Sequence, residues 1–268
     1  MYPYIHFLNR DISTYGICMA LGVVVCFLSM RLWSKRHHLS SRREASLDLA
    51  FILGLIGAIG GAKILYLLTV LPSLIKDLPY LFSQPRAFFM LYFAGGFVFY
   101  GGAYGILIIE LIYHRISKVP LEDIIRSLLP GVVLAHAFGR IGCFMQGCCY
   151  GAPTDSFIGI AFTHSNIAPN GVPLIPIQLI EAACEFVIFA LLLVLRRRST
   201  PRTMLVFYTI SYGITRFVLE FFRYDAYRGF IGALSLSQWI SIVTVGIGIG
   251  LLIRGHFHPE TMARPFEE

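Results

Sequence analysis

Seven long apolar runs constrain this chain more than any other feature of its sequence. A helix that crosses a bilayer needs about 20 mostly apolar residues, and each run is close to that length. We expect transmembrane helices at Thr14–Trp33, Leu47–Leu71, Leu91–Tyr113, Ile124–Gln146, Ile177–Leu195, Thr203–Phe222 and Leu234–Ile253. With 56% hydrophobic and only 14% charged residues, the chain does not have the composition of an ordinary soluble domain. The sequence therefore predicts an all-α, polytopic membrane protein that forms a single domain over residues 1–268.

The loop charges predict how this protein is oriented. Most basic residues fall in the first, third and fifth loops and in the C-terminal tail: Lys35, Arg36, Arg42, Arg43, Arg115, Lys118, Arg196, Arg197, Arg198, Arg202, Arg254 and Arg264. The other loops are poorer in positive charge, with Lys76 and Arg86 in the second, none in the fourth, and Arg223 and Arg228 in the sixth. Because cytoplasmic loops carry the excess of Lys and Arg, we expect the N-terminus outside and the C-terminus in the cytoplasm. The net charge of +7 is then explained without a nucleic acid.

This orientation brings polar residues from six spans to one depth, in the outer leaflet. They are Tyr15, Tyr100, His136, Arg140, Gln178, Glu181, Glu185, Tyr212, Arg216, Glu220, Arg223, Ser235, Ser237 and Gln238. Polar groups inside a membrane usually mark a substrate pathway, so we predict a polar cavity near the outer surface. Glu110 is the exception, and we expect it to reach cytoplasmic water. Lys63 is expected to snorkel or to pair with an acid.

Arginine is the most informative residue type in this cavity. His136 and Arg140 lie at i and i+4 in the stretch LAHAFGRIGCFMQGCCYG, so a helix places them on one face. An arginine inside an apolar run costs about 3 kcal/mol on insertion scales and needs a partner or a ligand. Arg140, Arg216 and Arg223 together suit a phosphate, and at this depth a phospholipid head group is the natural source. The alternatives are a structural Arg140 bound to backbone carbonyls and a simple pairing of Arg216 with Glu220 at i+4.

Spacing alone does not choose an acid or base for this cavity. The candidates are His136, Glu181, Glu220 and the tyrosines Tyr15, Tyr100 and Tyr212. Gly101 and Gly102 lie in the run GGFVFYGGAYG and allow close approach of a ligand or of a neighbouring helix. For any single glycine of this run, helix packing is the favoured reading.

Several motifs in order give the chain a resemblance to a known family. They are STYG at Ser13–Gly16, GGAK at Gly60–Lys63, GGFVFYGG at Gly95–Gly102, GRIGCF and QGCCYG around Arg140, Pro176 with Gln178 and Glu181, YGITRFVLEFFR at Tyr212–Arg223, and LSLSQ at Leu234–Gln238. Over nearly its whole length the sequence resembles the prolipoprotein diacylglyceryl transferases.

The resemblance implies both a reaction and a place. The family transfers the diacylglyceryl group of phosphatidylglycerol to the thiol of a lipobox cysteine in a preprolipoprotein, and glycerol phosphate leaves. It implies the bacterial cytoplasmic (inner) membrane, an active site near the outer leaflet, and phosphatidylglycerol, the signal-peptide region of the preprolipoprotein and membrane lipids as partners. No cofactor, metal ion or nucleic acid is expected.

The resemblance also assigns roles to single residues. Arg140 and Arg216 would hold the phosphate and stabilise the leaving anion. Tyr15, Tyr212, Glu220 and Gly151 fall on positions that the family treats as functionally important. Of these, Glu220 is a catalytic candidate. The other three are substrate-binding candidates, together with Gly101, Gly102, Gly142, Gln178, Glu181 and Arg223.

The chain departs from the family at four positions. The family motif reads G-R-x-G-N-F-x-N-x-E-x-x-G, and here Cys143 and Gln146 replace the asparagines and Cys148 replaces the glutamate. Tyr100 stands where the family has a histidine, which is a plausible base for the thiol there. Either His136 or Tyr100 itself is the replacement that we expect.

The cysteines Cys143, Cys148 and Cys149 have three readings. The favoured one is that they are small side chains of a divergent subfamily. The second is a disulfide between Cys143 and Cys148, because the outer face is oxidising. A zinc site lacks a convincing fourth ligand.

Other functions compete with the transferase. A lipid or small-solute transporter is one, although the sequence shows no internal repeat. A thiol-redox membrane protein is another, although no CxxC supports it. The more serious alternative is a related transferase with a different acceptor, because the departures fall at Tyr100 and Cys148.

Overall fold

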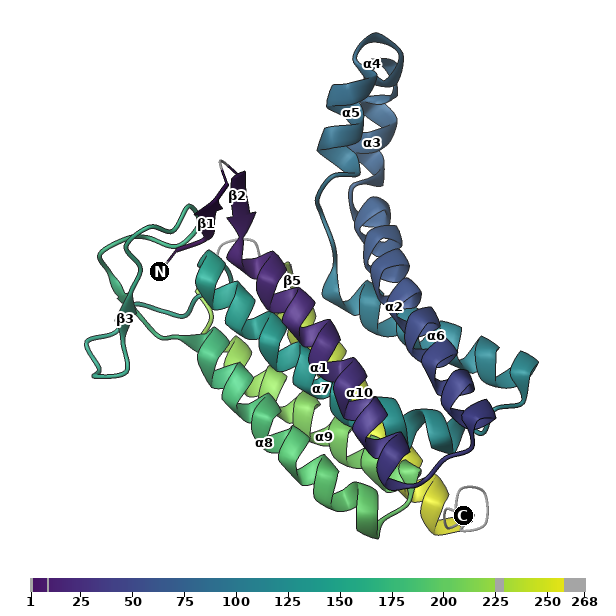
Figure 1. Ribbon diagram of the computed structural model, residues 1–268. Helices are drawn as coiled ribbons and strands as arrows, with labels where there is room; N and C mark the ends of the chain where they lie inside the picture. The colour runs from purple at the N-terminus through teal and green to yellow at the C-terminus, as the bar shows by residue number, and fades with distance from the viewer. Residues whose placement is uncertain (1, 9, 225–228, 258–268) are drawn as a thin grey trace. The chain divides into compact units, whose positions relative to one another are not determined.

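The computed structural model describes residues 2–8, 10–224 and 229–257, and it is mostly helical (Figure 1). The chain forms two compact units, one of Met1–His38 with Ile125–Glu268 and one of Leu39–Ile124. The prediction of a single domain stays a prediction, and two of the loop arginines, Arg228 and Arg264, lie outside the described residues.

The larger unit is a bundle of long helices. It contains α1 (Thr14–Arg36), most of α7 (Leu121–Gln146), α8 (Ile177–Arg198), α9 (Pro201–Glu220) and α10 (Leu236–Phe257), which run side by side (Figure 1). Only Ser199 and Thr200 separate α8 from α9, and a connection this short makes the two helices antiparallel neighbours. Buried apolar side chains on α7, α8 and α9 form the core between them: Val133, Ile188, Leu192 and Met204.

Small residues let α1 approach α7 closely. A Cβ added to Gly131 would lie 2.9 Å from the carbonyl oxygen of Cys26, and one added to Gly22 would lie 3.0 Å from that of Ala135. Small residues in contact are the usual means by which membrane helices pack, because lipid supplies no hydrophobic force between helices.

Three two-stranded antiparallel sheets occupy the connections. β1 (Tyr4–Phe7) pairs with β2 (Arg10–Ser13), β3 (Ile160–Ala161) with β4 (Pro173–Leu174), and β5 (Phe230–Ile231) with β6 (Leu234–Ser235). The strictly all-α prediction is therefore wrong for the loops, where strand pairing satisfies backbone groups that no helix satisfies. The first sheet and β3 lie at the same end of the helical bundle (Figure 1).

The smaller unit is built on two long helices. α2 (Ser41–Thr69) packs along α6 (Phe99–Ser117), and between them in sequence come the short helices α3 (Leu71–Lys76), α4 (Leu78–Ser83) and α5 (Pro85–Tyr92). The third span was predicted to begin at Leu91, but α6 begins at Phe99. The chain leaves helical conformation between α5 and α6, where Gly96 has a φ of +73°.

Lys63 explains how this break is stabilised. Its ammonium donates hydrogen bonds to the carbonyl oxygens of Tyr92 (3.1 Å), Gly95 and Gly96 (3.3 Å), which lie at and beyond the end of α5. The expectation that Lys63 pairs with an acid is therefore wrong, because the break provides backbone acceptors instead. Glu110 also differs from expectation, because it is only 5% exposed and lies against Gly54 of α2.

Five of the described helices are long and apolar enough to cross a membrane: α1, α2, α7, α8 and α10. Helices also form at the other two predicted places, as α6 and α9. The protein is thus a multi-pass membrane protein.

The contact between α2 and α6 gives a stability prediction with a built-in control. A Cβ on Gly61 would lie 2.2 Å from the backbone oxygen of Gly101, whereas a Cβ on Gly60 would meet nothing within 4 Å. We expect Gly61→Ala to destabilise the purified protein by about 1–3 kcal/mol, because α6 has to move away. Gly60→Ala should be neutral or slightly stabilising, since alanine is the better helix former. Thermal melting in detergent compares the two, and equal melting temperatures would contradict the close helix contact.

Candidate functional site

A row of alternating charges begins on α7 and α8 in the larger unit. Nδ1 of His136 lies 3.1 Å from Oε1 of Glu185. Nε of Arg140 donates a hydrogen bond of 3.3 Å to Nε2 of the same histidine. Nη2 of Arg140 lies 2.9 Å from Oε1 of Glu181. Both ring nitrogens of His136 are therefore engaged, and Arg140 is held from two sides.

The row continues onto α9. The second carboxylate oxygen of Glu181 lies 3.8 Å from Nη1 of Arg216, whose Nη2 forms a 2.7 Å ion pair with Glu220. Nη1 of Arg223 lies 3.3 Å from the same oxygen of Glu220. Nη2 of Arg216 also donates a 3.2 Å hydrogen bond to the hydroxyl of Ser237 on α10. We call the seven residues His136, Arg140, Glu181, Glu185, Arg216, Glu220 and Arg223 the charged cluster.

The charged cluster is buried and electrically balanced. Glu181 and Glu220 are 1% exposed and Arg216 is 4% exposed. It contains three arginines and three glutamates, so the charges of these side chains cancel. Such a balance is expected because a buried charge is costly unless it is paired. Nη1 of Arg216 is buried and, although it lies 3.8 Å from Glu181, makes no hydrogen bond within the described chain. The pairing of Arg216 with Glu220, which the spacing left open, is present, but it coexists with further contacts of both residues.

Helical spacing explains why these side chains meet. Glu181 and Glu185 are one turn apart on α8, and Tyr212, Arg216 and Glu220 are successive turns of α9. The cluster uses the C-terminal half of α7, the first half of α8 and the last half of α9, which lie together because the helices alternate in direction. In this unit the structure brings these side chains into contact with one another, and their shared depth in the membrane stays a prediction.

Two aromatic residues border the cluster. The ring of Tyr212 packs edge-on against that of His136, with centroids 5.2 Å apart. Tyr15, at the start of α1, contacts α7: a Cβ on Gly142 would lie 3.0 Å from its ring. Gly142, half a turn from Arg140, thus allows the tyrosine to approach the arginine-bearing helix.

The chain that follows α7 is tied to the helices around the cluster. Nε2 of Gln178 donates a 2.6 Å hydrogen bond to the carbonyl of Cys148, which fixes the turn after α7 to the start of α8. The amide of Gly151 donates to the carbonyl of Ile175 (3.0 Å), and Gly151 also forms an isolated bridge with Arg223. A Cβ on Gly151 would lie 2.6 Å from the oxygen of Ile175, so only glycine fits there without a shift.

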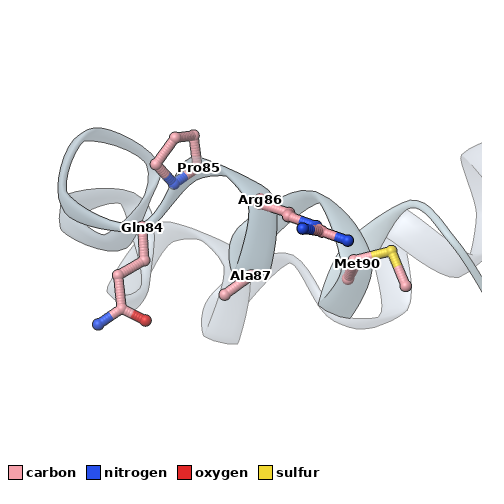
Figure 2. A pocket seen from close by; sticks show the side chains of 5 residues that line it. All are labelled: Gln84, Pro85, Arg86, Ala87 and Met90. Carbon is pink, nitrogen blue, oxygen red and sulfur yellow. The ribbon is translucent and has the colours of Figure 1, made fainter.

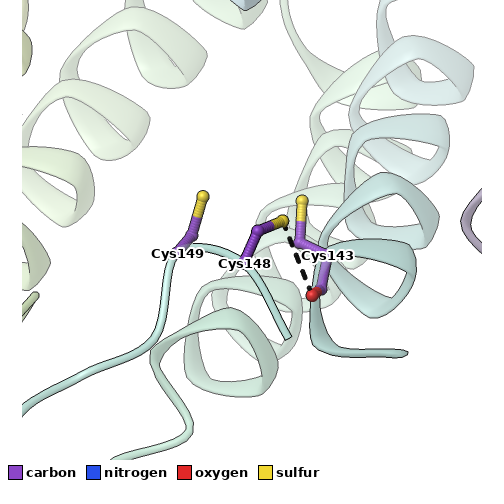
Figure 3. A group of neighbouring side chains, drawn as sticks. All are labelled: Cys143, Cys148 and Cys149. Carbon is purple, nitrogen blue, oxygen red and sulfur yellow. Dashed lines mark hydrogen bonds between the residues drawn. The ribbon is translucent and has the colours of Figure 1, made fainter. Parts of the chain in front are cut away.

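Three thiols gather in this same turn (Figure 3). The Sγ atoms of Cys143, Cys148 and Cys149 all lie within 4.8 Å of one another, and the thiol of Cys148 points to the carbonyl of Cys143 at 3.6 Å. The cysteines are half-buried and free, so the structure contains no disulfide between Cys143 and Cys148. Hydrogen bonds from the two neighbouring thiols, and then the charges of Arg223 and Arg140, lower the pKa of Cys149.

The remaining candidates belong to the smaller unit. Gly101 and Gly102 face α2, where a Cβ would come within 2.3 Å of the oxygen of Gly61 and 3.0 Å of that of Ala58, respectively. The structure thus shows them in helix packing, and a part in substrate binding stays a prediction. The hydroxyl of Tyr100 is buried and makes no hydrogen bond within the described chain.

A surface hollow of about 430 Å³ also lies in the smaller unit, at the start of α5 (Figure 2). It is lined by Gln84, Pro85, Arg86, Ala87 and Met90. It contains no acidic residue, histidine or cysteine, so it offers no acid–base pair. The charged cluster is the stronger candidate for chemistry.

Sequence reasoning placed Glu185 and Ser237 at the right level without giving either a role. The structure brings both into the cluster, as partners of His136 and Arg216. A signal existed for Glu185, since two glutamates one helical turn apart in an apolar run require cations on a neighbouring helix.

Comparison with known proteins agrees with the order of the motifs. A family model described as "Prolipoprotein diacylglyceryl transferase" matches residues 3–254. Phosphatidylglycerol–prolipoprotein diacylglyceryl transferase 2 of Clostridium perfringens is 38% identical over 244 residues, which cover 89% of each chain. The transferase of Clostridium tetani is 35% identical (88% of this chain and 90% of the relative), and that of Cupriavidus pinatubonensis is 30% identical (93% and 89%).

Proposed function

This chain belongs to the prolipoprotein diacylglyceryl transferase family, and from that premise we propose that it transfers the diacylglyceryl group of phosphatidylglycerol to a prolipoprotein cysteine. The observation that carries the proposal is the buried charged cluster, in which two guanidinium groups from different helices flank one carboxylate. Such an arrangement holds arginines in fixed positions inside a membrane protein, where a lipid phosphate has to be bound.

The cluster suits the chemistry at the phosphate. Glu181 and Glu220 orient the arginines before substrate arrives, so that little reorganisation is needed during the reaction. Nη1 of Arg216, which faces Glu181 at 3.8 Å but makes no hydrogen bond within the described chain, is a donor for a phosphodiester oxygen. As the glycerol phosphate leaves, its phosphate gains a second negative charge. Arg140 and Arg216 therefore stabilise the transition state more strongly than they stabilise the bound substrate, and this difference lowers the activation barrier.

The other candidates take supporting roles. Tyr15, Tyr212 and Gly142 border the arginines, and Gln178, Gly151 and Arg223 fix the turn beside them. We propose Tyr100 as a candidate base and Gly101 and Gly102 as substrate contacts, and these roles rest on their place in the sequence motif alone.

The same proposal includes the finer topology. Seven spans, with the N-terminus outside and the C-terminus in the cytoplasm, place the cluster in the outer leaflet of the bacterial inner membrane. Supporting this, α6 and α9 occupy the two remaining predicted spans, and basic residues fill the last turns of α1 and α8.

His136 has the contacts of a positioning residue rather than of a base. Its Nε2 accepts a hydrogen bond from Arg140, and its Nδ1 faces Glu185, so it has no ring nitrogen left for a substrate thiol. A glutamine can bridge the same two partners but cannot take up a proton. If His136 were the base, His136→Gln would cost about 10²–10⁴-fold in rate, the usual contribution of general-base catalysis.

We expect His136→Gln to stay within about tenfold of the wild-type rate with an unshifted pH profile, while His136→Ala falls further because Arg140 loses its support. Rates of glycerol phosphate release from pH 5 to 9 make the comparison. A deep loss in His136→Gln, with correct folding, would restore histidine as the base. Tyr100→Phe at full activity would remove the tyrosine from that role.

The function itself is tested with purified protein in detergent, phosphatidylglycerol and a lipobox peptide. Glycerol phosphate should be released when the peptide carries its cysteine and not when serine replaces it. Glycerol phosphate release that does not depend on the peptide would favour a related transferase with another acceptor. No release from folded protein would contradict the proposal and favour the transporter or redox alternatives.

A further inference from the structure

The three-cysteine group at the end of α7 has no role in the function proposed above. The hydrogen-bonded turn after α7 brings the three sulfur atoms within 4.8 Å of one another (Figure 3). Cys149 reaches the group through a left-handed backbone, with a φ of +59°, directly after the turn at Gly147. A residue other than glycine in that conformation is uncommon, and such strain is often found at functional sites.

The distances fit a thiolate-bound metal ion. Zinc–sulfur bonds of about 2.3 Å in a tetrahedral site place neighbouring sulfurs about 3.8 Å apart. The present separations of at most 4.8 Å exceed that value by no more than about 1 Å, which small side-chain rotations close. No histidine or carboxylate of the described chain joins the group, so three protein ligands leave one tetrahedral position open.

An open fourth position is the mark of a catalytic zinc site, where substrate or water completes the coordination. The zinc reading of the sequence lacked a fourth ligand, and the substrate of the proposed reaction supplies one, because the acceptor is itself a thiol. We propose that Cys143, Cys148 and Cys149 bind a zinc ion whose fourth ligand is the acceptor cysteine of the prolipoprotein. This inference rests on the proposed transferase function.

The surroundings suit this role in charge and in position. Zinc with three thiolates carries one negative charge, which a nearby cation offsets. Cys143 follows Arg140 by three residues on α7, so both lie on one face of the helix. An acceptor sulfur on the zinc ion would therefore stand next to the arginine that holds the lipid phosphate.

Coordination by zinc would also explain how the acceptor thiol is deprotonated without a histidine base. A thiol bound to zinc is deprotonated outright, and the thiolate is the nucleophile. The thiol proton goes to water. The sulfur forms a new S–C bond with the diacylglyceryl carbon while the C–O bond to the phosphodiester breaks, and the electron pair leaves with glycerol phosphate. Zinc keeps its oxidation state, so no oxidant or reductant takes part.

The first test measures metal binding without activity. Full-length protein is purified in detergent under reducing conditions, stripped of metal and titrated with Zn²⁺. We expect about one equivalent per chain in the wild type and in the control Cys184→Ser, which alters a half-buried cysteine outside the group. Cys148→Ser and Cys149→Ser should each weaken binding at least about tenfold, since each removes a ligand. A wild type that binds no Zn²⁺, or cysteine variants that bind it equally well, would overturn the proposal.

The second test asks whether the fourth position takes the acceptor. Co²⁺ in place of zinc reports its thiolate ligands by an intense absorption band, and the lipobox peptide should increase it while the serine peptide leaves it unchanged. If the cysteine peptide leaves the absorption band unchanged, the acceptor does not bind the metal and the site is structural. Glycerol phosphate release by the same preparations separates this inference from the proposed function. Full release without bound zinc would refute the part of zinc in the reaction and leave the transferase standing.

Discussion

Arg140→Ala is expected to lower peptide-dependent glycerol phosphate release by a factor of about 10²–10³, the usual cost of removing one donor to a developing anion. Arg140 is held by Glu181 at 2.9 Å and by His136 at 3.3 Å, so its guanidinium is fixed before the lipid arrives. Alanine removes the charge, leaves Glu181 with less compensation and gives water access to the site. The measurement is the rate at saturating phosphatidylglycerol, compared with the wild type.

Arg140→Lys separates a loss of catalysis from a loss of folding. Lysine keeps the positive charge near Glu181, but its compact ammonium does not reproduce the planar fork that also reaches His136. We expect a folded protein whose rate is still reduced more than about tenfold. Arg10→Ala, on an exposed strand residue, is the matched control and should keep the wild-type rate. Full activity in Arg140→Lys or Arg140→Ala would show that this arginine does not hold the phosphate.

Glu181→Gln should have the largest effect on stability. Its carboxylate is 1% exposed and lies between Arg140 and Arg216, at 2.9 Å and 3.8 Å. The amide has nearly the same shape but no charge, so both guanidinium groups lose their shared counter-ion. Breaking a buried ion pair costs about 3–5 kcal/mol, which corresponds to a fall of about 10 °C in melting temperature.

Asp155→Asn is the control for this change. It makes the same substitution of amide for carboxylate on an exposed loop residue, and it should alter stability by no more than about 0.5 kcal/mol. Thermal melting of both variants in one detergent gives the comparison. If Glu181→Gln has the same melting temperature as the wild type, then the charged cluster contributes no stability, and its arginines are not held in the way described.

The sequence predicted the helices well because length and hydrophobicity decide them. A helix stands at each of the seven apolar runs, and α8 begins at Ile177, as predicted. The break before α6 was not predicted. Gly95 and Gly96 lie inside an apolar run, and hydropathy carries no information about a left-handed backbone such as that of Gly96. Lys63 depends on the same break, since its partners are the carbonyls that the interrupted helix leaves.

The sequence predicted which residues belong to the site, but not which carboxylate pairs with which arginine. The predicted order and direction of the spans placed Arg140, Glu181 and Arg216 at one depth. Which carboxylate meets which guanidinium depends on how α7, α8 and α9 are rotated against one another, and one helix at a time does not reveal this. Glu181 therefore appeared as a general candidate, whereas the structure shows it between two arginines. The convergence of the cysteines likewise depends on the left-handed backbone of Cys149.

The central claim is that this chain joins a diacylglyceryl group to a cysteine thiol, and the mass of the acceptor peptide tests it most directly. Purified protein is incubated with phosphatidylglycerol and a lipobox peptide, and the peptide is then analysed by mass spectrometry. We expect the cysteine peptide to gain one diacylglyceryl group for each glycerol phosphate released, and Arg140→Ala to slow the formation of both products by the same factor. An unmodified peptide in the presence of folded wild-type protein and intact lipid would contradict the account.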